Sequence, residues 1–217
     1  MREQEQSASK ARIIAATINQ AKIAELTRIL DGVATVAALP RTVAPVSEPI
    51  GPTVEAIAAA KAAGYAKALG PDVIVVATDG GLVVPALGVA WDPCRTHRFA
   101  GEGATDAERA AKLLRLAENL DGANRRIAWR EAVALARGGA ILATWVAEGV
   151  AGELATNYDQ VDLTAGNGFW LPALWRCPEY DGRRLNSLTV AERTARDDHW
   201  SRLGRELRHF FAGLRIP

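Results

Sequence analysis

Two short apolar runs, each followed at once by a polar turn, constrain the fold of this chain most. They are residues 11–17 (ARIIAAT) and 73–77 (VIVVA). Short apolar runs bounded by turn signals are typical of strands buried in a sheet. After the first run, Asn19 suits a helix N-cap, and apolar residues then recur at helical spacing as far as Asp31. The chain is therefore predicted to open with a strand, a tight turn and a helix.

The later pattern alternates between helix and strand signals. The second strand is expected to end at a turn over 78–81, with 82–87 as an extension beyond it. Helices are predicted over 53–69, from the capping box at 105–108 to 120, and from the capping box at 189–192 to about 211. A hairpin is predicted over 126–136 and 140–150. Irregular chain is predicted over 40–52 and 157–187. We therefore expect an α/β fold with a long, twisted mixed sheet flanked by helices and a central cleft.

Composition excludes several classes of protein. The chain has 217 residues, of which 49% are hydrophobic and 24% charged, and its formal net charge is +1. A nucleic-acid-binding protein usually carries a basic surplus, and no apolar run approaches the roughly 20 residues of a membrane span. The polar N-terminus is unlike a signal peptide. We expect a cytoplasmic protein with a disordered tail over 1–10, a single domain over 11–217, and Cys94 and Cys177 as free thiols.

The first turn is suited to binding an anion. Residues 16–22 (ATINQAK) join a buried strand to a helix N-terminus, where free N–H groups and the positive end of the helix dipole collect. Thr17 and Asn19 supply short polar groups, and Lys22 can reach back from the first helical turn. The glycines of a Walker loop are absent. An ordinary N-cap beside a solvated lysine is the alternative.

Asp79 follows the second buried run, where α/β proteins place their ligands. Its carboxylate could hold Mg²⁺ or accept a proton from an attacking water, and Gly80 beside it would let a ligand approach the backbone. The alternative is a turn-forming aspartate. Glu55 and Lys61, on the helix over 53–69, are weaker candidates. Lys61 is the better of the two, because its neighbours are mostly alanine and an anion would have to pair with it.

A glycine-rich aromatic segment, residues 166–172 (GNGFWLP), is the third candidate. Phe169 and Trp170 beside flexible glycines could form a stacking surface for a planar base. The alternative is that both rings belong to the core. His199, on the last predicted helix, could hydrogen-bond to a ligand, although a lone histidine there is usually structural.

In their order and spacing these motifs resemble the inosine triphosphate pyrophosphatases, also called non-canonical purine NTP pyrophosphatases, from about residue 12 to 211. The family opens with T-x-N-x-x-K, which Thr17, Asn19 and Lys22 match. Its T-x-x-E-N-A-x-x-K-A helix is matched by Thr53, Lys61 and Ala62, its D-D-S-G-L strand end by residues 78–82 (TDGGL), and its S-A-R-[FY]-[AS]-G segment by residues 96–101 (THRFAG).

The chain departs from the family at the metal end of the site. The family's metal-binding glutamate falls at Ala56, so Glu55 stands one place early and about 100° around the helix. Thr78 replaces the first of the paired aspartates. Asp79 retains the second, which the family uses as metal ligand and water-activating base.

The chain departs further from the family in the residues that would recognise the base. Leu171 stands where the family's G-F-G-[YW]-D-P has its aspartate. The family's C-terminal S-H-R corresponds here to a different tripeptide that contains Asp198 and His199. On one alignment Arg193 takes the family's lysine position. An acidic side chain accepts from an exocyclic amine where a basic one donates to a carbonyl, so an altered base preference is predicted.

The resemblance implies two lobes, a homodimer, and hydrolysis of a nucleoside triphosphate to its monophosphate and pyrophosphate with Mg²⁺, or else Mn²⁺. It assigns Asp79 and Lys61 as catalytic, Asp79 and Glu55 to the metal, Thr17, Asn19, Lys22 and Gly80 to the phosphates, and Phe169, Trp170, Arg193 and His199 to the base. Two alternatives remain: a nucleotide-binding protein that has lost catalysis, and a pyrophosphatase of a modified-nucleotide biosynthetic pathway.

Overall fold

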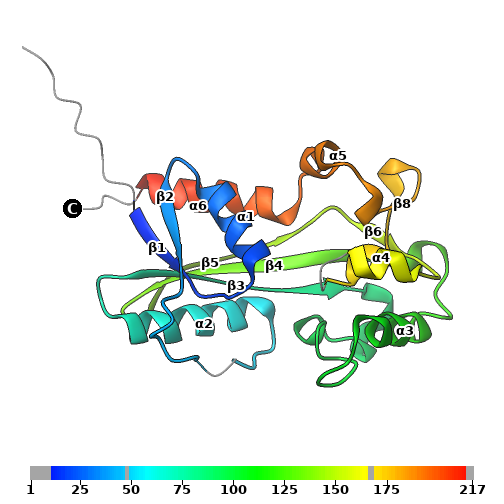
Figure 1. Ribbon diagram of the computed structural model, residues 1–217, viewed down its shortest axis with the longest axis horizontal. Helices are drawn as coiled ribbons and strands as arrows, with labels where there is room; N and C mark the ends of the chain where they lie inside the picture. The colour runs from blue at the N-terminus through cyan, green and yellow to red at the C-terminus, as the bar shows by residue number, and fades with distance from the viewer. Residues whose placement is uncertain (1–10, 47–48, 166–168, 214–217) are drawn as a thin grey trace, which may run out of the picture.

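A mixed eight-stranded sheet organises the molecule (Figure 1). The computed structural model describes residues 11–46, 49–165 and 169–213. The strands are β1 (Ala11–Ala15), β2 (Ala34–Ala38), β3 (Ile74–Val83), β4 (Arg126–Arg137), β5 (Ala140–Glu148), β6 (Gly152–Leu154), β7 (Trp175–Cys177) and β8 (Arg183–Arg184). Their order is β2-β1-β3-β4-β6-β7-β8, and β5 also pairs with β4. Because β1 is parallel to β2 and β3 while β3 and β4 are antiparallel, the predicted mixed α/β sheet is confirmed.

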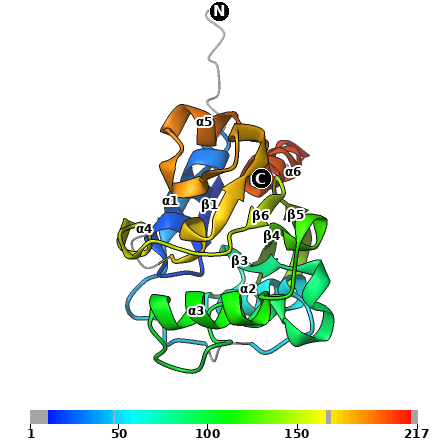
Figure 2. The same cartoon turned by 90° about the vertical axis from the view of Figure 1, so that its right-hand side faces the viewer.

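Helices cover both faces of this sheet. They are α1 (Gln20–Leu30), α2 (Val54–Leu69), α3 (Asp106–Leu116), α4 (Gln160–Ala165), α5 (Val190–Ala195) and α6 (His199–Gly213). Figure 1 shows α1 and α6 on one face of the β1–β3–β4 region and α2 on the other. Figure 2 shows α3 and α5 on opposite sides at the other end of the molecule. Asn19 and Thr105 cap α1 and α3, as the sequence predicts, and Thr53 caps α2.

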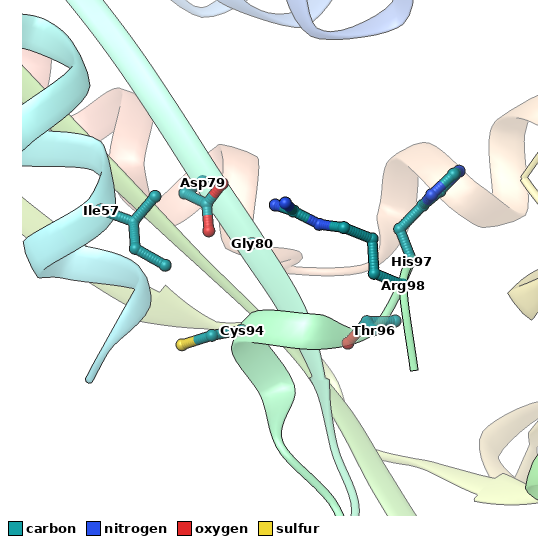
Figure 3. Close-up of a pocket in the computed structure, with 7 residues that line it drawn as sticks. All are labelled: Ile57, Asp79, Gly80, Cys94, Thr96, His97 and Arg98. Carbon is teal, nitrogen blue, oxygen red and sulfur yellow. The ribbon is translucent and has the colours of Figure 1, made fainter. Parts of the chain in front are cut away.

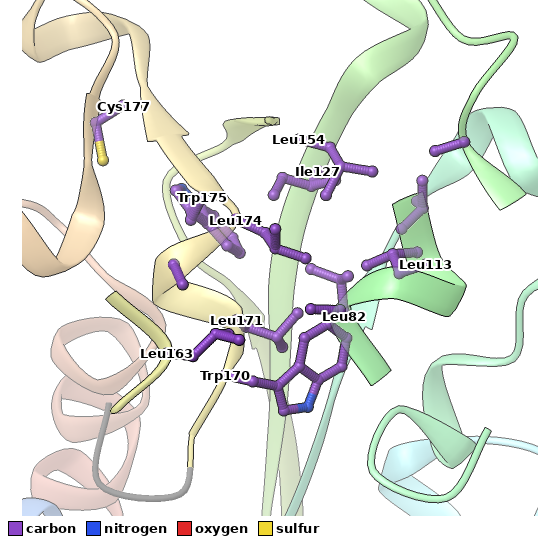
Figure 4. Packing of buried hydrophobic residues seen from close by; sticks show 14 of the residues in the cluster. Leu82, Leu113, Ile127, Leu154, Leu163, Trp170, Leu171, Leu174, Trp175 and Cys177 are labelled. Carbon is purple, nitrogen blue, oxygen red and sulfur yellow. The ribbon is translucent and has the colours of Figure 1, made fainter. Parts of the chain in front are cut away.

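The buried side chains form three clusters, which divide the molecule into two lobes. Two clusters lie on the two faces of the β1–β3–β4 region, one against α1 and α6, the other against the alanines of α2. Ala58, Ala62 and Ala66 have no exposed surface, so α2 packs closely on the sheet. The third cluster surrounds Trp170 and Leu171 between β4, β6, β7 and α3 (Figure 4). This distribution agrees with the two lobes that the resemblance implied.

Strand β3 corrects one prediction. Residues 78–81 do not form a turn, because they continue in register with β4, with Asp79 opposite Ala132 and Gly80 opposite Glu131. The two glycines serve close packing instead. A Cβ at Gly80 would lie 2.0 Å from Glu131 Oε2, and one at Gly81 would lie 2.0 Å from the Pro93 carbonyl oxygen. The two glycines are therefore needed within the strand, where neighbouring atoms leave no room for a side chain, and they do not end it.

Other boundaries also differ from the predictions. The short strand β2 was not expected, and α3 ends at Leu116 rather than near residue 120. Residues 157–187 contain α4, β7 and β8, and the C-terminal helical stretch is broken between α5 and α6, where Asp198 accepts a hydrogen bond from Ser201 N at 2.8 Å. The hairpin is confirmed, and both of its turn glycines have positive φ, 59° and 93°.

The tail predicted over 1–10 lies outside the described residues. Among the residues that are described, no helix combines the length and the apolar character needed to cross a bilayer.

Candidate active site

Asp79 lies on the α2 face of the sheet. Side chains alternate along a strand, and Val75 and Ala77 are buried against α2, so Asp79 points the same way. Its Oδ1 lies 3.4 Å from Lys61 Nζ, and the two side chains are 17% and 19% exposed. Burial raises the pKa of the Asp79 carboxyl above its usual value, and the charges of Lys61 and Lys22 oppose that rise. Lys61, which needed an anionic partner among its alanine neighbours, therefore has one.

Lys22 lies on the other face of the sheet and also has a buried partner. Its Nζ is 2.7 Å from Glu131 Oε1, and Trp129 Nε1 donates to Glu131 Oε2 at 2.9 Å. The Glu131 side chain is only 1% exposed. Glu131 was not among the residues predicted for the site, although one acidic residue inside the apolar strand REAVALA was a usable signal.

The loop before α1 forms an N-cap. Thr17 Oγ1 accepts from Asn19 N at 3.1 Å, and Asn19 Oδ1 accepts from Ala21 N at 3.0 Å and Lys22 N at 3.3 Å. The first backbone donors of α1 are thus used within the loop. The cap starts the helix so that Lys22 turns towards the sheet and Glu131, and Lys22 is not a solvated lysine.

A cavity of about 230 Å³ lies beside Asp79. It is lined by Ile57, Asp79, Gly80, Cys94, Thr96, His97 and Arg98. Figure 3 shows the Arg98 side chain extending towards Asp79 from across this cavity, whereas His97 points away. Arg98 lies in the segment that matches the family's S-A-R-[FY]-[AS]-G motif, but it was not among the predicted site residues.

The segment that carries Arg98 forms hydrogen bonds with two elements, β3 and α3. Thr96 Oγ1 accepts from Leu82 N of β3 at 2.9 Å. From α3, Arg109 Nε donates to the His97 carbonyl at 2.8 Å and Lys112 Nζ donates to the Phe99 carbonyl at 2.6 Å. The backbone around Arg98 is therefore held between β3 and α3.

A divalent cation would find the carboxylate of Asp79 in the wall of this cavity. No three or more His, Cys, Asp or Glu side chains of the described chain cluster as a metal site. Burial, Asp92, Asp79 and Glu55 together raise the pKa of the Cys94 thiol to about 11. Glu55 lies in the first turn of α2 and is not among the residues that line the cavity. Mg²⁺ usually keeps several waters and binds one or two carboxylates together with substrate phosphates. The donors present therefore fit Mg²⁺ that arrives with a nucleotide.

The two aromatic candidates differ in exposure. Phe169 is 44% exposed and packs edge-to-face on Trp129, with ring centroids 5.4 Å apart. Trp170 is 1% exposed among the apolar side chains of Figure 4, and its ring stacks on that of Phe99. The structure therefore does not place it where a base could stack. Leu171 is equally buried. The preceding glycines, in 166–168, lie outside the described residues.

His199 and Arg193 have different surroundings. Arg193 is exposed on α5. His199, the first residue of α6, has its ring centroid 6.4 Å from that of Trp129 and 5.5 Å from that of Trp200. Burial lowers the pKa of His199, and Glu131 and Asp198 oppose this. The structure thus gathers Phe169, Trp129 and His199 beside Glu131, without Arg193 among these ring contacts.

Comparison with known proteins decides the family. The model of the Ham1 family matches residues 13–168. This chain belongs to the Ham1 family. The predicted resemblance is therefore confirmed, and with it the enzyme class, a hydrolase acting on nucleoside triphosphates. A comparison with curated protein sequences gives no match.

Solved structures agree with the Ham1 assignment. A HAM1 protein from Coxiella burnetii is 27% identical with a TM-score of 0.75, covering 94% of this chain and 100% of its own. The Ham1 protein of Staphylococcus aureus is 26% identical with a TM-score of 0.74, covering 93% and 98%. A nucleoside-triphosphatase / dITP/XTP pyrophosphatase from Mycobacterium abscessus is 27% identical with a TM-score of 0.66, covering 94% and 100%.

Two partly or fully buried carboxylates of this chain lie on the two faces of the sheet. Thr78 is 2% exposed and carries no charge, so Asp79 is the acidic residue of β3. Glu131 of β4 contributes a second carboxylate, on the opposite face of the sheet. Lys61 pairs with the first and Lys22 with the second.

Proposed function

We propose that this chain hydrolyses a nucleoside triphosphate between its α- and β-phosphorus atoms, giving a monophosphate and pyrophosphate, with Mg²⁺ or Mn²⁺ as cofactor. The observation that carries the proposal is the position of Asp79, paired with Lys61, in the wall of a cavity that Arg98 enters from the other side. A partly buried carboxylate beside one lysine, facing an arginine across a cavity, is an arrangement suited to a phosphate chain and its metal ion.

In this proposal the phosphates are bound by charge. Lys61, Arg98 and Lys22 supply positive charge, and Gly80 lets a phosphate approach the strand backbone. Because Asn19 already accepts the first N–H groups of α1, the loop contributes through Lys22 more than through free backbone donors. Thr17 and Asn19 then act by holding the start of α1 in place.

Asp79 is proposed to handle the attacking water. The water oxygen forms a bond to the α-phosphorus, the bond to the bridging oxygen breaks, pyrophosphate leaves, and the water proton passes to Asp79 and then to solvent. Asp79 and Glu55 would hold the divalent cation, which neutralises charge developing on the phosphates. Lys61 keeps Asp79 ionised in a site whose burial favours the neutral acid.

The base is proposed to lie against Phe169 and His199. Phe169 offers exposed ring surface, and burial favours the neutral imidazole of His199. With Leu171 in the core and Asp198 capping α6, a base would meet a different set of groups from the family's motif. We include an altered base preference in the proposal, which strong selectivity for ITP and XTP would contradict. A homodimer and a cytoplasmic location complete it, on the family resemblance.

A pyrophosphate-release screen tests the function. The protein is incubated with canonical and modified nucleoside triphosphates, with Mg²⁺ and separately with Mn²⁺, and pyrophosphate is measured over time. Release from at least one triphosphate is expected. Triphosphate binding without release over hours would favour the nucleotide-binding alternative, and release from a single modified triphosphate would favour the biosynthetic one.

A further inference from the structure

Glu131 and Gly80 form a matched pair across β3 and β4. They stand directly opposite each other in the ladder, so their side-chain positions share one face of the sheet. A Cβ at Gly80 would lie 2.0 Å from Glu131 Oε2 and 2.9 Å from Trp129 Nε1. The serine of the D-D-S-G-L motif falls at Gly80, so the bare glycine is what leaves room for this carboxylate.

The position of Glu131 bears on the phosphate site. Its Oε1 forms an ion pair with Lys22 Nζ at 2.7 Å. The proposed function assigns Lys22 to the binding of the phosphates. A phosphate held by Lys22 would therefore meet two charges close together, the attractive ammonium and the repulsive carboxylate.

A shared metal site with Asp79 is a poorer explanation of Glu131. Asp79 continues the α2 face of β3, whereas Glu131 contacts Lys22 of α1 on the opposite face. Both Glu131 oxygens already accept hydrogen bonds, from Lys22 and Trp129, and the side chain is 1% exposed. Its chemistry in this position is that of a fixed counter-ion.

We propose that Glu131 is a positioning residue that competes with phosphate groups for the Lys22 ammonium and thereby weakens the hold of the site on product pyrophosphate. This rests on the proposed function, because it takes Lys22 as a phosphate-binding cation. The Lys22 ammonium has three donors, so it can contact a phosphate oxygen while Glu131 keeps part of its charge. Pyrophosphate then leaves a site whose positive charge is partly neutralised from within.

Inorganic pyrophosphate is the probe for this role, with its Kd measured by calorimetry in Mg²⁺. Glu131→Gln removes the charge and keeps an oxygen for Trp129 Nε1, so about tenfold tighter binding is expected. KM and kcat should fall together where product release limits turnover. Structural damage would weaken binding, so a gain in affinity separates the two explanations.

A double-mutant cycle tests whether Glu131 acts through Lys22. In a Lys22→Met background, Glu131→Gln should change the Kd for pyrophosphate much less than it does in the unmodified chain. The matched control is Glu25→Gln, which removes an equal charge from α1, where Glu25 pairs with Arg28 near the surface. No change in Kd is expected for this control.

Each result has a defined consequence. Unchanged or weaker pyrophosphate binding by folded Glu131→Gln overturns the inference, and so does an undiminished effect in the Lys22→Met background. If Glu131→Gln does not fold, Glu131→Asp takes its place, because its shorter side chain draws the carboxylate away from Lys22, and tighter binding is again expected. Lack of pyrophosphate release from every triphosphate would instead refute the proposed function, in a separate assay.

Discussion

At the scale of single residues, the chemistry centres on the carboxylate of Asp79, whose neighbours shift its pKa in opposite directions. Burial favours the neutral form of Asp79, and Lys61 and Lys22 favour the ionised form. The charges of these two lysines thus partly offset the effect of burial on the pKa of Asp79. This balance makes it sensitive to substitution of either partner.

Asp79→Asn is expected to reduce turnover about 10²–10⁴-fold, because the amide cannot accept the water proton and is a poor metal ligand. Because burial raises the folded-state pKa of Asp79, its ionised form weakens folding once the pH exceeds that pKa. The free energy of unfolding at neutral pH should therefore not fall in this variant. Steady-state assays and urea unfolding check the two parts, and retained turnover would refute the assigned role.

Lys61→Gln is expected to move the acidic limb of the profile of kcat/KM against pH to higher pH. Lys61 lowers the pKa of Asp79 by its charge and its hydrogen bond, so its removal lets burial raise that pKa further. Lys67→Gln, on the exposed side of the same helix, is the control and should leave the limb in place. An unshifted limb in Lys61→Gln would show that another group controls the acidic side.

At the scale of elements, β3 shows how a strand can be mistaken for a turn. Asp-Gly-Gly is a strong turn signal, yet these residues pair with β4 over their whole length. Gly81 is required by η2 (Pro93–Arg95), whose backbone approaches the strand and begins the segment that positions Arg98. The same contact thus fixes both the strand and one wall of the cavity.

Gly81→Ala is expected to lower the free energy of unfolding by about 1–3 kcal/mol, because its Cβ would meet the Pro93 carbonyl and force η2 away. Turnover should fall as well, since Arg98 moves with η2. Urea unfolding measures the first effect. Gly213→Ala, at the end of α6 with no atom within 4 Å of the added Cβ, is the control and should not destabilise the protein. An equal loss in both variants would count against this packing.

The sequence predicted the elements with regular signals and missed what depends on distant partners. Caps and apolar spacing identified α1 and α2, and they placed Lys22 and Asp79 as candidates that the structure brings within electrostatic reach of each other. Glu131 was missed because its significance comes from Lys22, 109 positions away. Trp170 was misjudged because local sequence cannot show whether an aromatic ring faces a ligand or the core.

At the scale of the whole molecule, the sheet joins two lobes, and the candidate site lies where elements of both meet. Asp79 lies on β3, in the part of the sheet that α1 and α2 cover from its two faces. Arg98 lies in a segment that is hydrogen-bonded to α3. A polyanion in the cavity would contact both parts at once.

Product analysis with the most active triphosphate of the screen tests the central claim most directly. Phosphorus NMR of the reaction mixture in Mg²⁺ should show monophosphate and pyrophosphate in equal amounts, with neither forming after chelation of the metal or in Asp79→Asn. A diphosphate with inorganic phosphate, or equal turnover by Asp79→Asn, would contradict the account.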